Sequence, residues 1–359
     1  MNNNSSYPYS TWITVDLSAI ENNVSILAAQ TGVPIMAVVK ANAYGHGIIP
    51  VARAAMQGGA EWLGVARVEE ALELRNAQFT CPILVMGYSP ESILLEAVSS
   101  GISITLWSRA QIEFLSRLAR ELQLPAKVHL KIDTGMSRLG AAGPEALSLA
   151  QEIIDTEFLE FEGLFTHYAR ADETDQLSTK EQETEFLEVL DELSRSGSKP
   201  AYVHAANSAA SLFRPDSRFT LIRPGISIYG LHPSCERSLP GDFRSALEWK
   251  AILSQVKVLP PGRGVSYGHE YITQKDERIG TIPIGYADGF RRVGNNQVLV
   301  GGKIVPVIGR VCMDQVCVQL DELPDAKAGD EVVIIGTQGD ARITAEQVAD
   351  RWGTINYEV

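Results

Sequence analysis

The chain has 359 residues, a length that predicts about two domains at roughly 150 residues each. Its composition, 45% hydrophobic and 21% charged, is typical of a globular protein and excludes collagen-like, extensively disordered and coiled-coil chains. The formal net charge of −13 argues against nucleic acid or an anionic membrane as a partner.

Cysteine usage and the first residues bear on the cellular compartment. The first residues, MNNNSSYPYSTW, lack a basic-then-apolar signal pattern, and no apolar run approaches the roughly 18 residues of a membrane span. The cysteines are scattered and form no CxxC pair, which is typical of free thiols in a reducing compartment: Cys81, Cys235, Cys312 and Cys317. We therefore expect a cytoplasmic protein that does not enter a membrane.

Short apolar runs alternate with amphipathic stretches over the first two thirds of the chain. The runs are 35–40, 62–66, 82–86, 102–106, 127–132, 161–166, 202–206 and 219–223. Helical spacing lies between them, for example at Val68–Asn76, Arg109–Leu122, Ala146–Ile154 and Thr179–Leu193. Eight such units favour an α/β fold of the (β/α)8, TIM-type barrel class over residues 1–245. A doubly wound open sheet is the alternative, which is weakened because no Gly-rich dinucleotide loop follows the first strand.

The pattern changes after about Leu247, where strand-like runs follow one another without helices. These runs are 249–258, 278–284, 297–300, 303–308, 315–320 and 331–335. They predict a C-terminal, mostly-β domain over residues 246–359, with residues 1–14 as a segment that could pack on it. Residues 232–242 are typical of a linker, and one late helix is expected over Thr344–Arg351 with Thr344 as its cap.

Lys40 lies at the end of the first apolar run, in AVVKANAYGHG. Burying an ammonium group is costly unless it is paired or neutralised, so an ordinary lysine here would emerge into solvent. The carboxyl ends of barrel strands are, however, where active sites collect. A lysine there could instead form a Schiff base with a carbonyl cofactor.

Polar residues follow several other strands of the predicted barrel. They are Asp133, Arg138, His167, Asn207, Ser208 and Arg223. One such residue is usually a cap or a loop hydrogen bond, whereas several at successive strand ends favour a site. Ser208 and Gly225 follow the last two strands, where barrel phosphate sites commonly form, although an ordinary turn and helix cap would look the same.

The β domain carries two further residues of interest. Tyr267 lies at an expected loop tip and would need a cationic neighbour to act as a base near neutral pH, since tyrosine ordinarily titrates near 10. Cys312 has no histidine near it in the sequence and is expected to be a structural thiol. His46, His232 and His269 lack metal-ligand spacing, so we expect no metal site.

Nine segments spread over almost the whole chain resemble the alanine racemase family, in that family's order. They are AVVKANAYGHG, KIDTGMSRLG, FTHYARAD, HAANSAA, RPGISIYG, VSYG, PIGYADGF, GRVCMDQ and TINYE. No single motif would suffice, whereas nine in order are specific. The family consists of pyridoxal-phosphate enzymes built from a (β/α)8 barrel and a C-terminal β domain, and the resemblance implies that cofactor and that architecture here.

The resemblance also implies roles for individual residues. Lys40 would bind pyridoxal 5′-phosphate covalently and act as one base, and Tyr267 would be the second base, reaching into the partner subunit's barrel in a homodimer. Arg223 would face the pyridine nitrogen with His167 in support. The remaining cofactor contacts would come from Tyr44, Ser208, Gly225, Ile226 and Tyr357.

Substrate contacts follow from the same resemblance. Arg138 and the backbone of Met313 would hold the substrate carboxylate, and Lys131 matches a position that is carbamylated in many family members and steadies Arg138. The substrate channel would be lined by Asp172, Tyr286, Arg292, Arg310 and Ile355. The implied activity is the interconversion of L-alanine and D-alanine, supplying D-alanine for peptidoglycan. The alternatives are a serine or broad-specificity racemase of the same family, a fold-related decarboxylase for basic amino acids, a non-enzymatic pyridoxal-phosphate carrier, and a binding or scaffold role.

The implied chemistry suits these residue types. Racemisation removes the Cα proton from one face and returns one to the other, so two bases on opposite sides are expected. Arginine stays protonated and can only donate to the ring nitrogen, which should keep that nitrogen unprotonated. The family usually continues beyond the TINYE motif, whereas this sequence ends two residues after Tyr357, and we expect a looser cofactor site or a weaker dimer for that reason.

Overall fold

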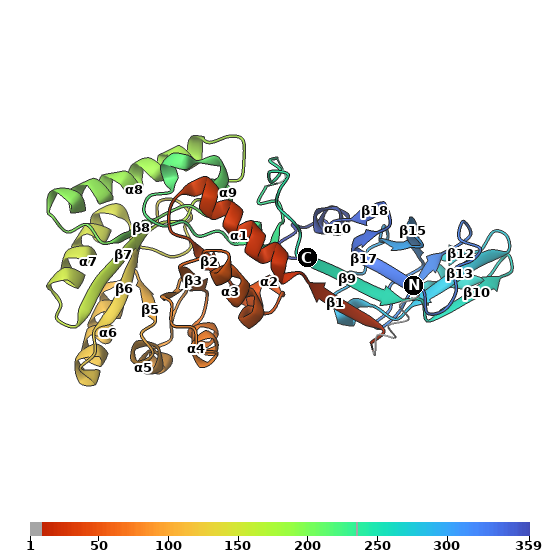
Figure 1. The fold of residues 1–359 in the computed structure, drawn as a ribbon, viewed down its shortest axis with the longest axis horizontal. Helices are drawn as coiled ribbons and strands as arrows, with labels where there is room; N and C mark the ends of the chain where they lie inside the picture. Colours follow the sequence, from red (N-terminus) through yellow and green to blue (C-terminus); the bar gives the residue numbers. More distant parts are fainter. Residues whose placement is uncertain (1–8, 235) are drawn as a thin grey trace. The chain divides into compact units, whose positions relative to one another are not determined.

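The structure, a computed structural model, describes residues 9–234 and 236–359. It divides into two compact units (Figure 1). Leu17–Ala246 form one unit, here called the barrel unit. Residues 9–16 join Leu247–Val359 in the other, here called the β unit.

Seven parallel strands form the sheet of the barrel unit and pair in chain order. They are β2 (Met36–Val38), β3 (Trp62–Val65), β4 (Ile83–Val85), β5 (Ser103–Leu106), β6 (Ala126–Lys131), β7 (Leu159–Phe165) and β8 (Tyr202–His204). Each coincides with one of the predicted apolar runs. Most of their residues are buried, because helices and the barrel interior cover both faces of a parallel sheet.

The eighth predicted run, 219–223, closes the sheet although it is too short and irregular to count as a strand. Ile222 forms a parallel bridge with Ile35, and the Met36 N–H donates to the Ile222 carbonyl at 2.8 Å. On its other side the Thr220 N–H donates to the Val203 carbonyl at 3.1 Å. Backbone hydrogen bonds therefore join this segment to both β2 and β8, and the predicted barrel class is confirmed.

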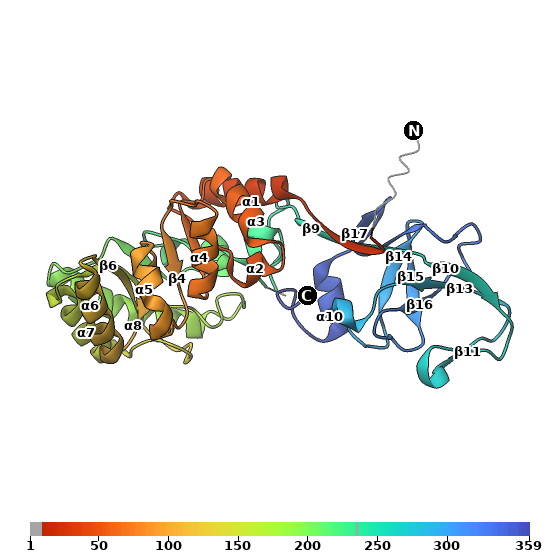
Figure 2. The ribbon, with the colours of Figure 1, turned by 90° about the horizontal axis from the view of Figure 1, so that it is seen from below.

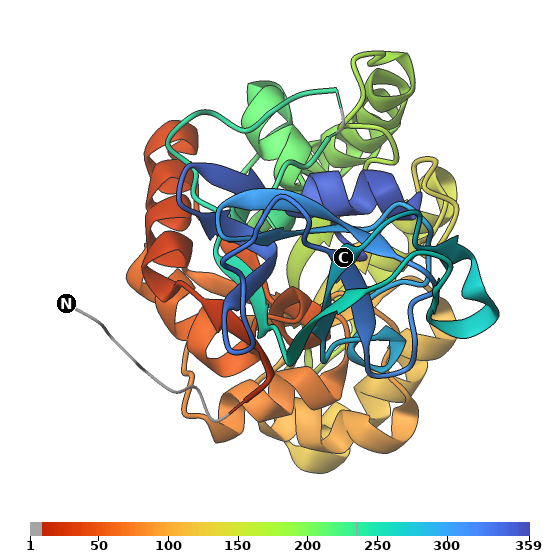
Figure 3. The same cartoon turned by 90° about the vertical axis from the view of Figure 1, so that its right-hand side faces the viewer.

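Helices cover the outside of the barrel. Those that follow strands are α3 (Ile48–Gln57), α4 (Val68–Asn76), α5 (Glu91–Ser99), α6 (Arg109–Leu122), α7 (Gly143–Asp155), α8 (Leu177–Arg195) and α9 (Ser208–Phe213), the last continued by the 3-10 turn η1 (Pro215–Ser217). Figure 2 shows α4, α5 and α6 in succession, and in Figure 3 the barrel helices, red to green, form a ring. The four helical stretches named from the sequence all lie within this set.

The helix that completes the ring comes before the first barrel strand. After the eighth segment the chain makes only the 3-10 turn η2 (Ile226–Tyr229), and α1 (Leu17–Thr31) packs against η2, α3 and α9. The buried Asn23 amide fixes α1 there, because it donates to the carbonyls of Ile228 at 3.0 Å and Arg244 at 2.8 Å. The sequence pattern did not indicate this rearrangement.

The β unit is built on one antiparallel sheet. Its main path is β1-β9-β17-β14-β15-β16-β13-β10, and β18 pairs with β17 (Figure 1). The bounds are β1 (Thr11–Val15), β9 (Leu247–Ile252), β10 (Gln255–Leu259), β13 (Glu277–Ile282), β14 (Gln297–Val300), β15 (Lys303–Ile308), β16 (Val316–Gln319), β17 (Glu331–Gln338) and β18 (Ala341–Ile343). Strand β1 pairs with β9, so the amino-terminal segment that the structure describes adds a strand to this sheet.

One predicted run of the β unit is wrong in extent. Residues 249–258 were expected as a single strand, but they belong to β9 and β10, which lie apart in the sheet. The chain turns at Leu253, which is fully buried and whose N–H donates to the Asp330 carbonyl at 2.9 Å. A continuous apolar pattern does not reveal such a break, because the residue at the turn is itself part of the core.

Two smaller features complete the β unit. A short ribbon of β11 (Gly264–Val265) and β12 (Tyr271–Ile272) flanks the 3-10 turn η3 (Tyr267–His269). The late helix is α10 (Ala345–Trp352), and the Thr344 hydroxyl caps it by accepting from the Gln347 N–H at 3.2 Å, as predicted.

Within the described ranges, no helix combines the length and apolarity needed to cross a membrane.

Candidate active site

Lys40 begins the short turn α2 (Lys40–Tyr44), directly after β2 at the carboxyl end of the barrel. Its side chain is half-buried rather than free in solvent. Burial lowers the pKa of the Lys40 amine, the positive charges of Arg138 and Arg223 lower it further, and the Glu70 carboxylate opposes them. A half-buried amine with a lowered pKa has a larger uncharged fraction than an ordinary lysine, as a nucleophilic or basic amine requires.

The backbone after Lys40 is unusual. Residues 41–44 all have φ between 52° and 54°, the left-handed region, although none of them is glycine. Such residues cost roughly 1–2 kcal/mol each, so the surrounding structure must hold them. The Ala41 N–H donates to Glu70 Oε1 at 2.5 Å, and Asn42 Oδ1 accepts from the Ile48 N–H at 2.8 Å.

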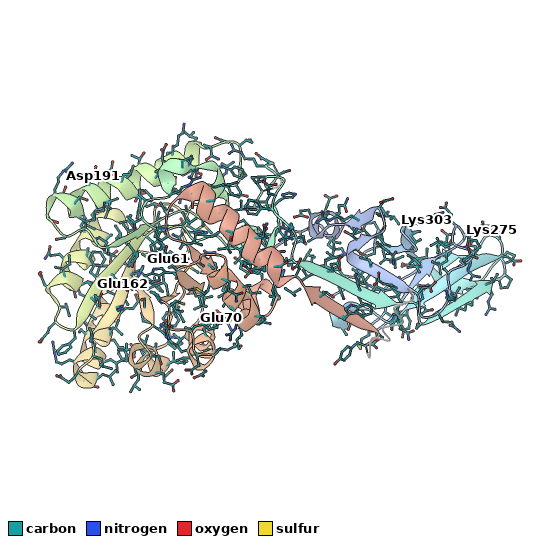
Figure 4. The ribbon with its side chains drawn as sticks, in the orientation of Figure 1. Glu61, Glu70, Glu162, Asp191, Lys275 and Lys303 are labelled. Atoms are coloured by element: carbon teal, nitrogen blue, oxygen red, sulfur yellow. The ribbon has the colours of Figure 1, made fainter. Side chains whose placement is uncertain are left out.

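Glu70 ties this turn to the end of the next strand. Its other carboxylate oxygen, Oε2, accepts from the N–H groups of Ala66 at 2.9 Å and Arg67 at 3.1 Å, just before α4. Figure 4 labels Glu70 in this part of the barrel unit. Sequence reasoning missed this residue, although a glutamate in the first turn of a predicted helix is a capping-box position and could have been noticed.

Arg223 is buried at the end of the eighth segment, beside β2, whose Val38 N–H donates to the Pro224 carbonyl at 3.0 Å. Its Nη2 donates to the Thr166 carbonyl at 2.8 Å and lies 3.2 Å from His167 Nδ1. Burial lowers the pKa of Arg223 to about 10, which leaves it charged at neutral pH. Burial, and then the charge of Arg223, hold the pKa of His167 well below its usual value, so His167 is neutral.

Lys131 lies at the end of β6 and is 4% exposed. Its ammonium lies 5.6 Å from the centroid of the Phe165 ring, and the Arg223 guanidinium lies 5.3 Å from the same centroid. Burial, followed by the charges of Arg138 and Arg223, lowers the pKa of Lys131 to about 8. The barrel mouth is therefore strongly cationic, which suits an anionic ligand.

Ser208, Gly225 and Tyr44 meet at one point of the barrel mouth. The Ser208 hydroxyl oxygen accepts from the N–H groups of Gly225 at 2.8 Å and Ser227 at 3.3 Å. A Cβ at Gly225 would lie 2.4 Å from the Tyr44 hydroxyl, so only glycine allows this approach. Burial raises the pKa of Tyr44 to about 12, and its phenol therefore stays protonated as a donor. Ile226 follows as the first residue of η2 and is buried.

Two other residues of the predicted site lie in loops of the barrel unit. Arg138 is exposed, in a turn that Asp133 holds through its Oδ1, which accepts from the N–H groups of Gly135 at 3.1 Å and Ser137 at 2.8 Å. The Asp172 carbonyl accepts a hydrogen bond from the Ser234 hydroxyl. Burial raises the pKa of the Asp172 carboxyl above its usual value.

In the β unit, three of the nine motifs form one cluster. The Tyr286 N–H donates to the Cys312 carbonyl at 3.1 Å, and the Ala287 N–H donates to the Met313 carbonyl at 3.0 Å. The Ser266 hydroxyl, next to Tyr267, donates to the Arg310 carbonyl at 2.6 Å.

The large side chains of this cluster are exposed. The exposed fraction is 70% for Tyr267, 52% for Met313 and 47% for Tyr286. Arg310 pairs with Glu270, and its hydrogen bond lowers the pKa of the Glu270 carboxyl. The charge of Arg292 lowers this pKa further. Ile355 and Tyr357 follow α10 and are also exposed.

The thiols show no catalytic arrangement in the described residues. Cys81, Cys312 and Cys317 are free, and Cys312 Sγ lies 3.3 Å from the Ser266 hydroxyl. The prediction for Cys235 lies outside the described residues, as do residues 1–8 of the amino-terminal segment. No group of three or more His, Cys, Asp or Glu side chains in the described ranges could hold a metal ion.

A closed barrel with a lysine, an arginine and hydroxyl groups at the carboxyl ends of its strands is an enzyme scaffold. The family model described as "Alanine racemase, N-terminal domain" matches residues 15–233, and "Alanine racemase, C-terminal domain" matches residues 246–359. The chain therefore belongs to the alanine racemase family.

Individual proteins of known name agree with this assignment. Alanine racemase from Desulfovibrio desulfuricans is 42% identical over 97% of this chain and 94% of its own length. The crystal structure of alanine racemase from Bacillus anthracis with bound L-Ala-P has a TM-score of 0.92 at 40% identity, covering 99% and 92% of the two chains. A histidine racemase from Leuconostoc mesenteroides subsp. sake has a TM-score of 0.89 at 29% identity, covering 99% and 96%.

Proposed function

We propose that this protein interconverts L-alanine and D-alanine with pyridoxal 5′-phosphate. It would act in the cytoplasm as a homodimer with shared active sites and supply D-alanine for peptidoglycan. The observation that carries the proposal is the half-buried Lys40 amine with its lowered pKa. It lies directly after β2, the strand next to the segment that bears Arg223. Family membership supports alanine as the substrate.

The residues at the barrel mouth fit the cofactor. The Lys40 amine can bond to its aldehyde carbon, and the hydroxyls of Tyr44 and Ser208 with the Gly225 backbone can hold its phosphate. Because residue 225 is glycine, the Tyr44 hydroxyl can lie where a side chain at that position would otherwise be, beside the Gly225 backbone. When bound, pyridoxal phosphate supplies the electron sink that makes the Cα proton of an amino acid removable.

Arg223 would set the electronic character of this site. Its guanidinium has only donors, so it can donate to a ring nitrogen but not accept from it. The hydrogen bonds from Arg223 to His204 and to the Thr166 carbonyl, and the neutral His167 beside it, keep this donor in place. The family resemblance also assigns Ile226 and Tyr357 as contacts of the cofactor, and we propose the same role for them here.

Two bases would move the proton. Lys40 holds or returns the Cα proton on one face with its amine, whose lowered pKa favours the uncharged form. Tyr267, from the β unit of the partner subunit, would do the same on the opposite face. Its 70% exposure on its own unit supports this role, because the hydroxyl is available to another surface.

The substrate carboxylate would be held by Arg138 and the backbone of Met313. Lys131 would be carbamylated and would then steady Arg138. Its pKa of about 8 supports this modification, since only an uncharged amine reacts with carbon dioxide. The channel to the site would be lined by Asp172, Tyr286, Arg292, Arg310 and Ile355.

The test is to incubate the purified protein, loaded with pyridoxal phosphate, with L-alanine and to measure D-alanine by chiral chromatography. We expect D-alanine to form until the two enantiomers are equal, and Lys40→Ala to abolish both the reaction and the visible absorbance of the bound cofactor. Lys180→Ala, which changes an exposed lysine of α8, is the matched control and should leave both unchanged.

The same assay with other amino acids tests the alternatives. We expect L-serine and L-histidine to react at least about ten times more slowly than L-alanine, since pocket contacts of a single group are worth about 1–3 kcal/mol. Faster reaction of L-serine would favour the serine or broad-specificity racemase. Release of carbon dioxide would favour a decarboxylase, and an active protein without bound pyridoxal phosphate would contradict the proposal.

A further inference from the structure

The interior of the barrel holds a line of polar side chains where such barrels normally hold branched apolar ones. His129 on β6 and His204 on β8 are 0% exposed, and Glu162 on β7 is 7% exposed. Figure 4 labels Glu162 on the sheet of the barrel unit. Burying these groups costs several kcal/mol unless each is hydrogen-bonded, so their arrangement calls for an explanation.

A continuous chain of hydrogen bonds runs from Arg223 to Glu162. Arg223 Nη1 lies 2.9 Å from His204 Nδ1, and His204 Nε2 lies 2.9 Å from His129 Nδ1. His129 Nε2 then lies 3.1 Å from Glu162 Oε2, which also accepts from the Ser103 hydroxyl at 2.5 Å. The chain links a buried cation to a buried carboxylate through two rings.

The direction of donation along this chain follows from Arg223 alone. A guanidinium nitrogen can only donate, so His204 Nδ1 must accept and His204 carries its proton on Nε2. That proton is donated to His129 Nδ1, so His129 also carries its proton on Nε2. His129 then donates to the Glu162 carboxylate, and both histidines are neutral with the same tautomer.

The electrostatic surroundings agree with this assignment. Burial, and then the charge of Arg223, hold the pKa of His204 well below its usual value. Burial likewise lowers the pKa of His129, against the opposing effect of Glu162. Burial would raise the pKa of Glu162, but the interaction with His129, the hydrogen bond from Ser103 and the charge of Lys127 together outweigh it and keep the pKa lowered.

Close packing holds the two rings in place. A Cβ at Gly163 would lie 2.2 Å from His129 Nδ1, so glycine is required for the ring to lie there. The His204 ring stacks on Phe165 with centroids 4.7 Å apart and planes 8° apart. Trp62 meets the edge of His129 at 5.6 Å. Rings fixed in this way can hold a neighbour in position.

The Glu162 end of the chain approaches solvent, and at the other end the Arg223 Nε–H is available to a further acceptor. Lys127 Nζ lies 3.4 Å from Glu162 Oε1 and its side chain is 42% exposed. Nη2 of Arg223 is occupied by the Thr166 carbonyl at 2.8 Å and the Ala205 carbonyl at 3.1 Å. Among the described residues, Arg223 Nε has no hydrogen-bond acceptor.

We propose that Glu162, His129 and His204 form a positioning relay, which balances the charge of Arg223 from within the barrel and orients its Nε–H as the donor to the cofactor ring. The part that concerns the cofactor rests on the proposed function. None of the three residues touches the cofactor or substrate in this proposal, and all three act through Arg223. A purely structural cluster would stabilise the barrel without this effect on the reaction.

The first test measures which nitrogen of each relay histidine is protonated, without measuring activity. The full chain, loaded with pyridoxal phosphate and labelled with ¹⁵N-histidine, gives signals from only six histidines in NMR. We expect His129 and His204 to be neutral Nε2–H tautomers near neutral pH. A proton on Nδ1 of either ring, or an imidazolium, would overturn the proposal.

The second test separates positioning from stability. Glu162→Gln removes the charge, and its amide oxygen can still accept from His129 and Ser103. We expect kcat for alanine to fall about 10-fold, as when an outer partner of a functional group is lost, with KM within about two-fold. In an Arg223→Lys background the same change should alter kcat by less than about two-fold, because the relay acts only through Arg223. Equal losses in both backgrounds, or no loss in either, would refute the relay.

Two further variants complete the design. His204→Phe keeps the stack on Phe165 but removes both nitrogens, and should reproduce the kcat loss. Glu277→Gln is the matched control, because it makes the same change to a carboxylate in the β unit that is 2% exposed and accepts from Tyr271 at 2.5 Å. It should lower Tm but leave the signals of His129 and His204 in place, and movement of those signals would indicate a general effect that refutes the relay.

These tests distinguish the relay from the proposed function. If the wild-type protein fails to racemise alanine, the histidine tautomers still decide whether the relay exists. If it racemises alanine but the tautomers differ from those expected, only the relay is refuted.

Discussion

The two units hold their residues of interest in opposite ways. In the barrel unit Lys131, Ser208 and Arg223 are each 4% exposed, and backbone hydrogen bonds or ring contacts within the unit fix the site. In the β unit Tyr267 is 70% exposed and Met313 is 52% exposed. The barrel residues are therefore held in place by contacts within their own unit, whereas the side chains of the β unit are exposed on theirs.

This difference has a consequence for substitutions. A change at a buried barrel residue should alter stability together with chemistry, because the same contacts serve both. A change at an exposed residue of the β unit should alter chemistry with little effect on stability.

The largest effect is expected for Tyr267→Phe. Loss of a general acid–base group lowers kcat by roughly 100- to 10,000-fold, while an exposed hydroxyl contributes less than about 0.5 kcal/mol to folding. Tyr271→Phe in the neighbouring strand is the control, since its hydroxyl donates to Glu277 at 2.5 Å. It should lower stability by about 1 kcal/mol and retain activity. Steady-state kinetics and thermal unfolding of both variants check this, and equal activities would break the comparison.

Gly225→Ala should affect both properties. The new Cβ would lie 2.4 Å from the Tyr44 hydroxyl and must displace it, so we expect a loss of about 1–3 kcal/mol in stability and weaker cofactor binding. Gly241→Ala is the matched control, because a Cβ there meets nothing within 4 Å. Cofactor titration and denaturant unfolding measure both. Wild-type cofactor affinity in Gly225→Ala would mean that this close approach does not shape the phosphate site.

Glu70→Gln tests the left-handed turn after Lys40. The amide can accept with one oxygen only, so the N–H groups of Ala41, Ala66 and Arg67 can no longer all be satisfied. We expect a loss of about 1–2 kcal/mol in the free energy of unfolding. Removing the negative charge should also lower the pKa of the free Lys40 amine further, which a pH titration of the rate of covalent cofactor binding to the cofactor-free protein would report. An unchanged titration and unchanged stability would contradict the role of Glu70.

The smallest effect concerns Lys131 in buffer free of carbon dioxide. Its pKa is lowered from 10.5 to about 8 in the folded state, so the unfolded chain binds more protons between these values. The cost of burying the ammonium is complete below about pH 8 and disappears as the pH rises towards 10.5. The Tm difference between Lys131→Met and the wild type should therefore favour the variant at neutral pH and shrink above pH 8. A difference that does not change with pH would refute the lowered pKa.

Much of this fold follows from sequence pattern alone. Each of the eight apolar runs marks a barrel segment, because a strand covered on both faces is mostly apolar. Thr344 caps α10 because a hydroxyl at that position accepts from the first turn of the helix. These features depend only on residues that are close together in the sequence, so the sequence pattern reveals them.

The remaining features depend on three-dimensional contacts. No pattern of neighbouring residues indicates that α1 completes the helix ring. None indicates that the chain turns at Leu253 within a continuous apolar run. The relay is partly visible in the sequence, since three of the predicted apolar strands each contain one of its polar residues: His129, Glu162 and His204. A polar residue within an apolar run could have been singled out, but its partners come from other strands and only the closed barrel brings them together.

In the proposed mechanism, racemisation needs Lys40 of one subunit and Tyr267 of the other. It is tested most directly by mixing the inactive variants Lys40→Ala and Tyr267→Phe under conditions that exchange subunits. In a mixed dimer with shared sites, one of the two sites receives both intact residues, so activity should rise to about a quarter of the wild-type value. If the mixture stays as inactive as the separate variants while mixed dimers are shown to form, the shared two-base site is contradicted.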